Sequence, residues 1–454
     1  MKKKSLQPAQ IIVLSFLSVI IIGALLLSLP IATIGEGRAP LIDSLFTATS
    51  ATCVTGLIVK DTGNFFSPFG RLVILCLIQV GGLGIMTFST MFAILLGRKL
   101  SMSQNSTVQS AIGHTKIEGM AKLIIYIITF TFAIELIGAI CLFFRWRATT
   151  GWGVALTAER AVFHAISAFC NAGFSLFSNS LADFMADKVI VAIFSFLIVI
   201  GGIGFVVFLD IPKLKFWRKD RALIVSRISL QTKIVLLVTI TLIILGAIGV
   251  YAFENQNTLS GLGVKEKISS CLFTSITPRT AGFNVLDTGA LRPVTLFMLI
   301  MLMFIGASPG STGGGIKTVT FGIILAAFYS MFHNRERINL FGRTIPRETY
   351  RRAAVIIFLG ICVVVTSTFL LSATETARAE SGHHFLSLLF ESTSAFGTVG
   401  LSTGITPNLS VLGKLIIICT MFIGRIGPLT LALAVAMRRE KLDYRYPEEK
   451  LMVG

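Results

Sequence analysis

Charged residues are scarce in this chain, and cysteine and tryptophan are scarcer still. Only 14% of the 454 residues are charged, against about 25% in an ordinary soluble domain, whereas 54% are hydrophobic. This composition excludes a soluble enzyme, and it excludes disorder because disordered chains are poor in apolar residues. The seven cysteines form no C-x-x-C pair, so we expect neither a disulfide framework nor a transition-metal site. The sequence predicts an integral membrane protein with many spanning helices.

Acidic residues are also few, with 22 Asp and Glu against 40 Lys and Arg, which gives a net charge of +18. In a soluble protein such an excess would suggest a nucleic-acid partner. Here the basic residues gather in alternate connections between apolar segments, as the positive-inside rule expects of cytoplasmic loops. We therefore expect both termini to be cytoplasmic, the loops to contact anionic lipids, and no nucleic acid to bind. The clusters lie at residues 2–4, 98–122, 213–233, 335–352 and 438–450.

Eight apolar intervals are long enough to span a bilayer, whose core requires about 20 apolar residues in a helix. The first interval is too long for a cleaved signal peptide, whose apolar stretch has only about 7 to 15 residues. Two intervals carry an internal charge, Glu135 and Arg425. The intervals are residues 5–35, 72–97, 123–144, 189–209, 234–253, 293–334, 353–374 and 415–437.

A short phrase recurs four times between pairs of these intervals, on the outer side of the membrane. Its copies lie at residues 50–57, 167–174, 277–283 and 394–401, and each ends in a glycine followed by Leu or Phe. The copies divide the chain into four consecutive units, residues 1–100, 101–220, 221–340 and 341–454. Each unit has the pattern of a spanning helix, a short apolar segment that does not cross, a turn at glycine, and a second spanning helix.

This pattern predicts an all-α integral membrane fold made of four consecutive helix–pore loop–helix units. Eight transmembrane helices and four re-entrant pore helices would surround one pseudo-fourfold pore, and the last unit would end in a cytoplasmic tail. Irregular backbone at membrane depth is tolerated only where it is buried in protein or lines an aqueous cavity. Four such loops therefore meet most economically around a single path.

The recurring glycines predict an ion-selectivity filter. An alkali cation needs a ring of oxygens that replaces its hydration shell, and glycine adopts the positive φ values that point successive carbonyls the same way. For a single copy the alternative is a tight turn or a helix C-cap, but four copies in one topological position favour the filter. Acidic residues at the expected starts of the first two pore helices, Asp43 and Glu159, suit the positive end of a helix dipole. The predicted filter residues are Cys53, Val54, Thr55, Gly56, Cys170, Asn171, Ala172, Gly173, Arg279, Thr280, Ala281, Gly282, Gly397, Thr398, Val399 and Gly400, with the thiols of Cys53 and Cys170 packed behind the filter.

The second spanning interval of the third unit contains ten residues with five glycines and a proline, which no regular helix accommodates. We expect the helix to break there and to resume near Ile316. A polar segment at mid-membrane must line the cavity, so we interpret it as a gate below the filter. The alternative is an ordinary glycine kink, which needs only one or two such residues. The predicted gate comprises Gly306, Ala307, Ser308, Pro309, Gly310, Ser311, Thr312, Gly313, Gly314 and Gly315, together with Lys317 and Arg425.

Arg425 occupies a position where the other units have Gly82, Gly202 and Ala307. A charge inside a span is costly and marks a functional site by default. Arg425 could raise a barrier to cations or hold the loop of residues 306–315 through backbone carbonyls; the alternative is a buried pair with Glu135 or Asp210. Lys317 allows the same interpretations. The glycines of the first two second spans, at 81–82 and 201–202, we interpret as sites of close helix approach.

Enzyme chemistry finds little support in the sequence. Residues 310–318 resemble a phosphate-binding loop but follow a membrane helix rather than a strand. His164 with Ser167, or Ser308 with Ser311, lacks the positioned base and acid that a hydrolase requires. We therefore expect no catalytic residues.

The recurring phrases resemble those of the Trk/Ktr/HKT superfamily of potassium transporters, most closely the membrane subunit of bacterial Ktr systems. The resemblance covers nearly the whole chain. Its motifs are C-V-T-G-L at 53–57, N-A-G-F at 171–174, T-P-R-T-A-G-F at 277–283, F-G-T-V-G-L at 396–401 and I-G-R-I-G-P at 423–428.

The resemblance implies uptake of K⁺ across the bacterial cell membrane through a filter whose key glycines are Gly56, Gly173, Gly282 and Gly400. Glycine rather than serine at position 56 favours K⁺ over Na⁺, and a Na⁺ dependence of uptake is also implied. The resemblance further implies a homodimer on a cytosolic ring of RCK/KTN-type regulatory subunits that bind ATP or ADP. These would dock on the basic loops and on residues 438–454. A coupled K⁺/Na⁺ or K⁺/H⁺ symporter with alternating access remains the alternative, because transporters also use broken helices.

Overall fold

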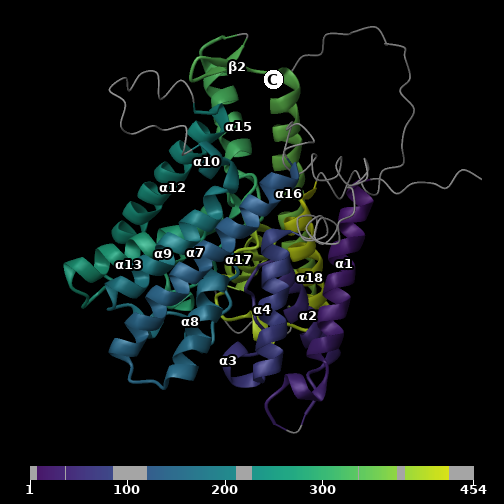
Figure 1. Ribbon diagram of the computed structural model, residues 1–454. Helices are drawn as coiled ribbons and strands as arrows, with labels where there is room; N and C mark the ends of the chain where they lie inside the picture. The colour runs from purple at the N-terminus through teal and green to yellow at the C-terminus, as the bar shows by residue number, and fades with distance from the viewer. Residues whose placement is uncertain are drawn as a thin grey trace, which may run out of the picture.

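The structure is a computed structural model that describes residues 8–35, 37–84, 120–210, 228–335, 337–375 and 384–428 (Figure 1). These residues are almost entirely helical, as the sequence predicts. Several predicted features lie outside the described residues. They are residues 85–97 and 429–437 of two predicted spans, most of the basic clusters, and the tail at 438–454.

Four long helices open successive quarters of the chain, in agreement with four of the predicted spans. Three of them contain stretches that are long and apolar enough to cross a membrane, namely Ile124–Thr149, Leu230–Glu254 and Arg347–Thr374. The four helices are α1 (Pro8–Leu27), α7 (Met120–Thr149), α12 (Leu230–Glu254) and α16 (Arg347–Thr374).

A shorter helix follows each long one and ends where a recurring phrase begins its turn. Their lengths, from 12 to 16 residues, are too short to cross the bilayer core. These helices are α2 (Leu41–Thr52), α8 (Val154–Phe169), α13 (Val264–Ile276) and α17 (His384–Gly397). Short 3₁₀ turns lie elsewhere in the connections, at Pro30–Ala32, Ala182–Phe184, Thr288–Ala290 and Thr406–Asn408.

The next helix of each quarter is shorter than the sequence predicts. Gly84, Gly204 and Gly427 directly follow three of these helices and have φ values of 78°, 88° and 90°. A residue at positive φ ends a helix, so these three predicted spans are interrupted at an equivalent place, whereas we expected an interruption in the third unit alone. The helices are α4 (Pro68–Leu83), α9 (Lys188–Ile203), which α10 (Phe205–Asp210) follows, α14 (Pro293–Phe304) and α18 (Val411–Ile426).

The helices pack as a closed cycle. Each shorter helix contacts the long helix before it and also a helix of the preceding quarter: α8 packs on α4, α13 on α9, and α17 on α14. The cycle closes because α2, in the first quarter, packs on α18, in the last. The ends of the four shorter helices are thereby brought together in the middle of the molecule.

A β-hairpin between α15 (Thr318–Phe332) and α16 is an exception to the all-α prediction. Its strands, β1 (Ile338–Leu340) and β2 (Arg343–Ile345), are joined by Phe341 and Gly342, whose φ values are 50° and 75°. Two consecutive residues at positive φ are typical of a tight hairpin turn. Strands of three residues leave too little alternation for a sequence pattern to detect. In Figure 1 the hairpin lies at the end opposite α3 (Thr62–Phe65).

Trp146 anchors the packing of α7 against α8 and α9. Its indole is fully buried, and its ring centroid lies 5.4 Å from that of His164 and 5.6 Å from that of Phe177. The same ring contacts Phe194 on α9, at 6.4 Å. His164 is part of this aromatic cluster and bonds to Ser175 rather than to Ser167, as suits a core histidine.

We expect Trp146→Ala to lower the free energy of unfolding by about 3–5 kcal/mol, because a large buried side chain leaves a cavity. Phe144→Ala is the matched control, since Phe144 lies on the same helix and is 67% exposed. The measurement is equilibrium unfolding of the purified chain in detergent. Equal losses in the two variants would contradict this account of the packing.

Candidate functional site

The four loops that follow the shorter helices share one unusual backbone conformation. In each loop the recurring glycine and the residue two positions before it have positive φ. For the glycines, φ is 94° at Gly56, 70° at Gly173, 74° at Gly282 and 91° at Gly400. For the earlier residues, φ is 56° at Val54, 58° at Asn171, 71° at Thr280 and 49° at Thr398. Positive φ is uncommon in residues other than glycine, and for a β-branched residue it is an outlier, so the repeat indicates a shared constraint.

The amide of the residue before each glycine turns back toward its own helix. Thr55 donates its N–H to the Ser50 carbonyl at 2.8 Å, and Val399 does the same to Ser394 at 2.8 Å. Ala172 and Ala281 repeat the bond to Ser167 and Thr277 at 2.7 and 2.9 Å. The hydroxyls of Ser50 and Ser394 also accept the glycine amides, from Gly56 at 3.0 Å and Gly400 at 3.1 Å. These serines were missed by the sequence analysis, although a Ser-Ala pair in three of the four phrases marks them.

The four loops close into a ring of backbone. A methyl group placed on Gly56 would lie 2.5 Å from the carbonyl oxygen of Ala172, in the next loop. The same relation joins Gly173 to Ala281 O at 3.0 Å and Gly282 to Val399 O at 2.4 Å. It closes with Gly400 and the carbonyl oxygen of Thr55, at 2.1 Å. The structure therefore brings the four predicted glycines together, and no side chain fits at these positions.

The ends of the shorter helices add partial negative charge to this ring. The last carbonyls of a helix have no intrahelical partner, and the C-terminal end carries the negative end of the helix dipole. Asp43 lies in the first turn of α2, as predicted, and is paired with Lys414 at 2.7 Å. The prediction for Glu159 is wrong, because α8 begins five residues earlier, at Val154, and Glu159 pairs with Arg71 at 2.9 Å.

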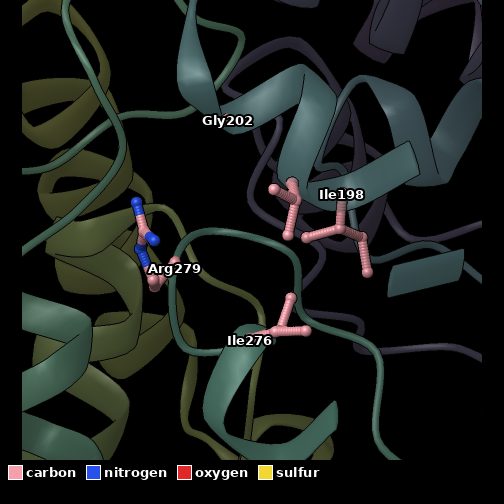
Figure 2. A pocket seen from close by; sticks show the side chains of 5 residues that line it. Ile198, Gly202, Ile276 and Arg279 are labelled. Carbon is pink, nitrogen blue, oxygen red and sulfur yellow. The ribbon is translucent and has the colours of Figure 1, made fainter. Parts of the chain in front are cut away.

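The residues three positions before each glycine are Cys53, Cys170, Arg279 and Gly397. Both cysteines are fully buried, and their packing behind the filter stays a prediction. The Cys170 sulfur lies 3.6 Å from Glu135 Oε1. Arg279 directs its guanidinium to Thr239 on α12, with Nη2 donating to Oγ1 at 3.0 Å. Figure 2 shows this side chain directed away from Ile198 and Ile276, beside a cavity of about 10 Å³.

A broken helix lies against one side of the ring. Helix α14 ends at Phe304 and α15 begins at Thr318, which confirms the predicted interruption. The connecting segment, residues 305–317, is called the central loop below. Its Thr312 hydroxyl donates to the carbonyls of Phe169, at the end of α8, and Gly201, at 3.3 and 3.2 Å. Gly314 donates its N–H to the Thr398 hydroxyl at 3.1 Å. The central loop is therefore hydrogen-bonded to the second and fourth quarters of the chain.

Two cationic side chains hold the central loop through its carbonyls. Arg425 donates to the carbonyl oxygens of Thr312 and Gly81, so it links the loop to α4. Lys317 Nζ donates to Gly313 O at 2.6 Å and Gly314 O at 3.3 Å. This arrangement agrees with the loop-holding interpretation of Arg425.

The alternative interpretation of Arg425, a buried ion pair, is wrong for the described part of the chain. No salt bridge joins Arg425 to a described carboxylate. Both oxygens of Glu135 accept from Gln79 Nε2 at 3.1 Å, and Asp210 accepts from the Thr232 hydroxyl at 2.6 Å. Carbonyls serve as partners because Thr312 lies in the broken loop and Gly81 in the last turn of α4, where backbone carbonyls have no intrahelical partner.

The glycines of the second helices allow a close helix approach, as we expected for Gly81 and Gly201. A methyl group on Gly81 would lie 2.0 Å from the Thr52 carbonyl oxygen, and one on Gly201 would lie 1.9 Å from that of Phe169. Gly424 has the same relation to Phe396, at 1.9 Å. The partner at each of these close approaches is the end of a shorter helix.

Comparison with known proteins relates the chain to cation transporters. The family described as "TrkH: Cation transport protein" matches residues 2–443. The "Ktr system potassium uptake protein B" of Bacillus subtilis is 41% identical over 98% of this chain and 97% of its own length. The "Potassium/sodium uptake protein NtpJ" of Enterococcus hirae is 38% identical over 100% of this chain and 98% of its own. The crystal structure of the potassium transporter TrkH from Vibrio parahaemolyticus matches with a TM-score of 0.73 and 19% identity, covering 96% of this chain and 86% of that one.

Gly400→Ala and Gly404→Ala form a matched pair that tests the ring. Both glycines have φ of 91°, but a methyl group at Gly404 meets nothing within 4 Å. We expect Gly404→Ala to cost about 1–2 kcal/mol for its backbone alone, and Gly400→Ala about 1–3 kcal/mol more for the collision with Thr55 O. Thermal unfolding in detergent measures the difference. Equal melting temperatures would mean that the ring is not closed at this point.

Proposed function

The chain belongs to the TrkH family of cation transport proteins, and we propose that it takes up K⁺ through the ring of four loops. It is a transporter and not an enzyme. Relatives named for potassium uptake are similar to it over nearly their whole length. The observation that carries the proposal is the closed ring of backbone at Gly56, Gly173, Gly282 and Gly400.

The ring acts as the selectivity filter. A K⁺ ion exchanges its water for oxygens that bind it firmly enough to enter and weakly enough to leave, and backbone carbonyls meet this need. The amides of Thr55, Ala172, Ala281 and Val399 bond back to their own helices, and their carbonyl oxygens lie close to the glycine of a neighbouring loop. The same residues are uncharged, so selectivity arises from carbonyl geometry.

The four quarters are then four helix–pore loop–helix units around one pore, with boundaries at residues 1–100, 101–220, 221–340 and 341–454. The cyclic packing of the shorter helices supports this arrangement. The shorter helices α2, α8, α13 and α17 are the re-entrant pore helices. Their C-terminal ends supply the partial negative charge that a cation favours.

The central loop is the gate, held closed by Arg425 and Lys317. Unpaired backbone at membrane depth requires partners, and the two cations supply them. Arg425 bridges two carbonyls that belong to different units, Thr312 and Gly81. Releasing this bridge frees the loop from α4.

The transporter lies in the bacterial cell membrane with both termini in the cytoplasm, as a homodimer on a cytosolic ring of RCK/KTN-type subunits that bind ATP or ADP. Basic loops, including the hairpin flanked by Arg337 and Arg347, are the docking surface and also contact anionic lipids. Na⁺ stimulates uptake. The printed name of the Enterococcus hirae relative, which includes both potassium and sodium, supports a role for both ions.

A filter predicts selective uptake of rubidium tracer into K⁺-loaded proteoliposomes of the purified chain. External K⁺ should block the uptake and equal Na⁺ should not. Gly282→Ser should lose most of this discrimination. Gly282 has φ of 74°, and a Cβ atom at this position would lie 2.4 Å from the Val399 carbonyl oxygen, which leaves no room for a side chain. Gly404→Ala, outside the ring, should retain it. Retained selectivity in Gly282→Ser would refute the filter, and uptake that requires a Na⁺ or proton gradient would favour a coupled symporter.

If the hydrogen bonds of Arg425 hold the gate closed, Arg425→Ala should raise rubidium flux about tenfold or more, because charge-assisted hydrogen bonds contribute about 1.5–3 kcal/mol. Arg425→Lys separates the two interpretations of the arginine. Lysine keeps the charge but lacks the planar fork whose two nitrogens bond separately to Thr312 O and Gly81 O, so flux should also rise if these two hydrogen bonds hold the loop closed. Flux that rises in Arg425→Ala alone would show that Arg425 acts as an electrostatic barrier.

A further inference from the structure

The central loop touches the ring directly, through Thr398. The Gly314 amide donates to Thr398 Oγ1 at 3.1 Å, and both residues are buried. Thr398 is one of the four ring residues other than glycine at positive φ, with φ of 49°. The hydrogen bond therefore joins a strained residue of the proposed filter to the proposed gate.

Three consecutive glycines shape the loop to the ring. A methyl group on Gly313 would lie 2.0 Å from Thr280 Oγ1, and one on Gly314 would lie 2.4 Å from Thr398 Oγ1. On Gly315 it would lie 3.2 Å from the Cα of Gly397. These glycines allow close contact, because any side chain would hold the loop away from the ring.

The equivalent residues of the other units do not bond to the loop within the described chain. Val54 has no hydroxyl. Asn171 and Thr280 are hydrogen-bonded to each other at 3.3 Å, which joins the second and third units. Thr398 is thus the ring residue whose side chain binds the loop, and it lies in the unit that also supplies Arg425.

A β-branched residue at positive φ is strained, and such strain persists only where surrounding contacts enforce it. The helix-end bond from the Thr398 amide to Ala395 O, at 3.1 Å, is one of these contacts. The bond to Gly314 is another. Loss of the bond to Gly314 leaves the strained backbone held by the hydrogen bonds of the turn to α17.

We propose that the Thr398 hydroxyl couples the gate to the filter, so that the closed loop holds the fourth ring residue in its filter conformation and loop opening changes K⁺ binding in the ring. This inference rests on the proposed roles of ring and loop. Coupling of this kind is reciprocal: K⁺ binding that favours one conformation of Thr398 must also favour one position of the loop.

The test introduces Thr398→Val into the wild-type chain and into Arg425→Ala. Two quantities are measured for each protein, the rubidium flux and the external K⁺ concentration that halves this flux. Thr398→Val keeps the β-branch and removes the hydroxyl. We expect flux to rise about three- to tenfold, the factor that one hydrogen bond gives to an equilibrium, and the half-blocking K⁺ concentration to shift. In Arg425→Ala, where the loop is already released, the same substitution should change flux by less than about twofold.

Three further variants serve as controls. Thr398→Ser restores the hydroxyl and should reverse most of the increase. Ser392→Ala removes another buried hydroxyl of α17 that has no hydrogen-bond partner among the described residues, and it should behave as wild type. Gly314→Ala leaves the ring sequence intact and should raise flux like Thr398→Val, so the test holds even if Thr398→Val does not fold.

The outcomes separate this inference from the function on which it rests. An Arg425→Ala variant with wild-type flux would refute the gate itself. If Arg425→Ala raises rubidium flux as expected, but Thr398→Val changes flux by the same factor in wild type and in Arg425→Ala, the gate stands and the coupling alone is refuted. An unshifted half-blocking K⁺ concentration with raised flux would show that the hydroxyl acts on the loop without reaching the filter.

Discussion

The architecture depends on one constraint, which is that backbone carbonyls left unpaired deep in an apolar protein must find partners or face a cation. Four shorter helices end in the middle of the molecule, where no solvent-facing loop can satisfy them. Gly81, Gly201 and Gly424 allow a neighbouring helix to approach the ends of the shorter helices, and two serine hydroxyls accept the amides of ring glycines. In the function we propose, the ring carbonyls are left for the ion. The ring is also closely packed, because a carbonyl of each loop fills the space that a side chain on the neighbouring loop's glycine would occupy.

The departures from fourfold repetition are concentrated on one side of the ring. The third unit has the central loop, the fourth has Arg425 and Thr398, and the second has the Gly201 carbonyl that accepts from Thr312. In the function we propose, a filter binds an ion from all sides, whereas a gate moves as one piece, and the gate's hydrogen bonds lie on a single broken helix. Among the described residues, the hydrogen bond from Gly314 to Thr398 joins this broken helix to a side chain of the ring.

Much of the site could be predicted from local patterns. Four similar phrases at regular spacing identified the ring glycines, because positive φ is a property of a few neighbouring residues and appears in the sequence as glycine. The break after Phe304 was detectable for the same reason, since five glycines in ten residues exclude a helix. Glu159 was misplaced because Gly153, rather than an acidic residue, caps α8. The breaks at Gly84, Gly204 and Gly427 were missed because a single glycine inside an apolar interval is compatible with a continuous helix.

The sequence by itself determined the membrane class, the long helices, the four turns and the broken helix, since each depends on composition or on residues close together in the chain. Only the tertiary structure decided the order of packing around the ring, the partners of Arg425 and the contact of Gly314 with Thr398. These contacts join residues up to 344 positions apart, as Arg425 and Gly81 show. A hydrogen bond to a backbone carbonyl also cannot be predicted from the type of residue that accepts it, because every residue has a carbonyl. The sequence could therefore indicate that Arg425 needed a partner, but only the fold determined which carbonyls lie within its reach.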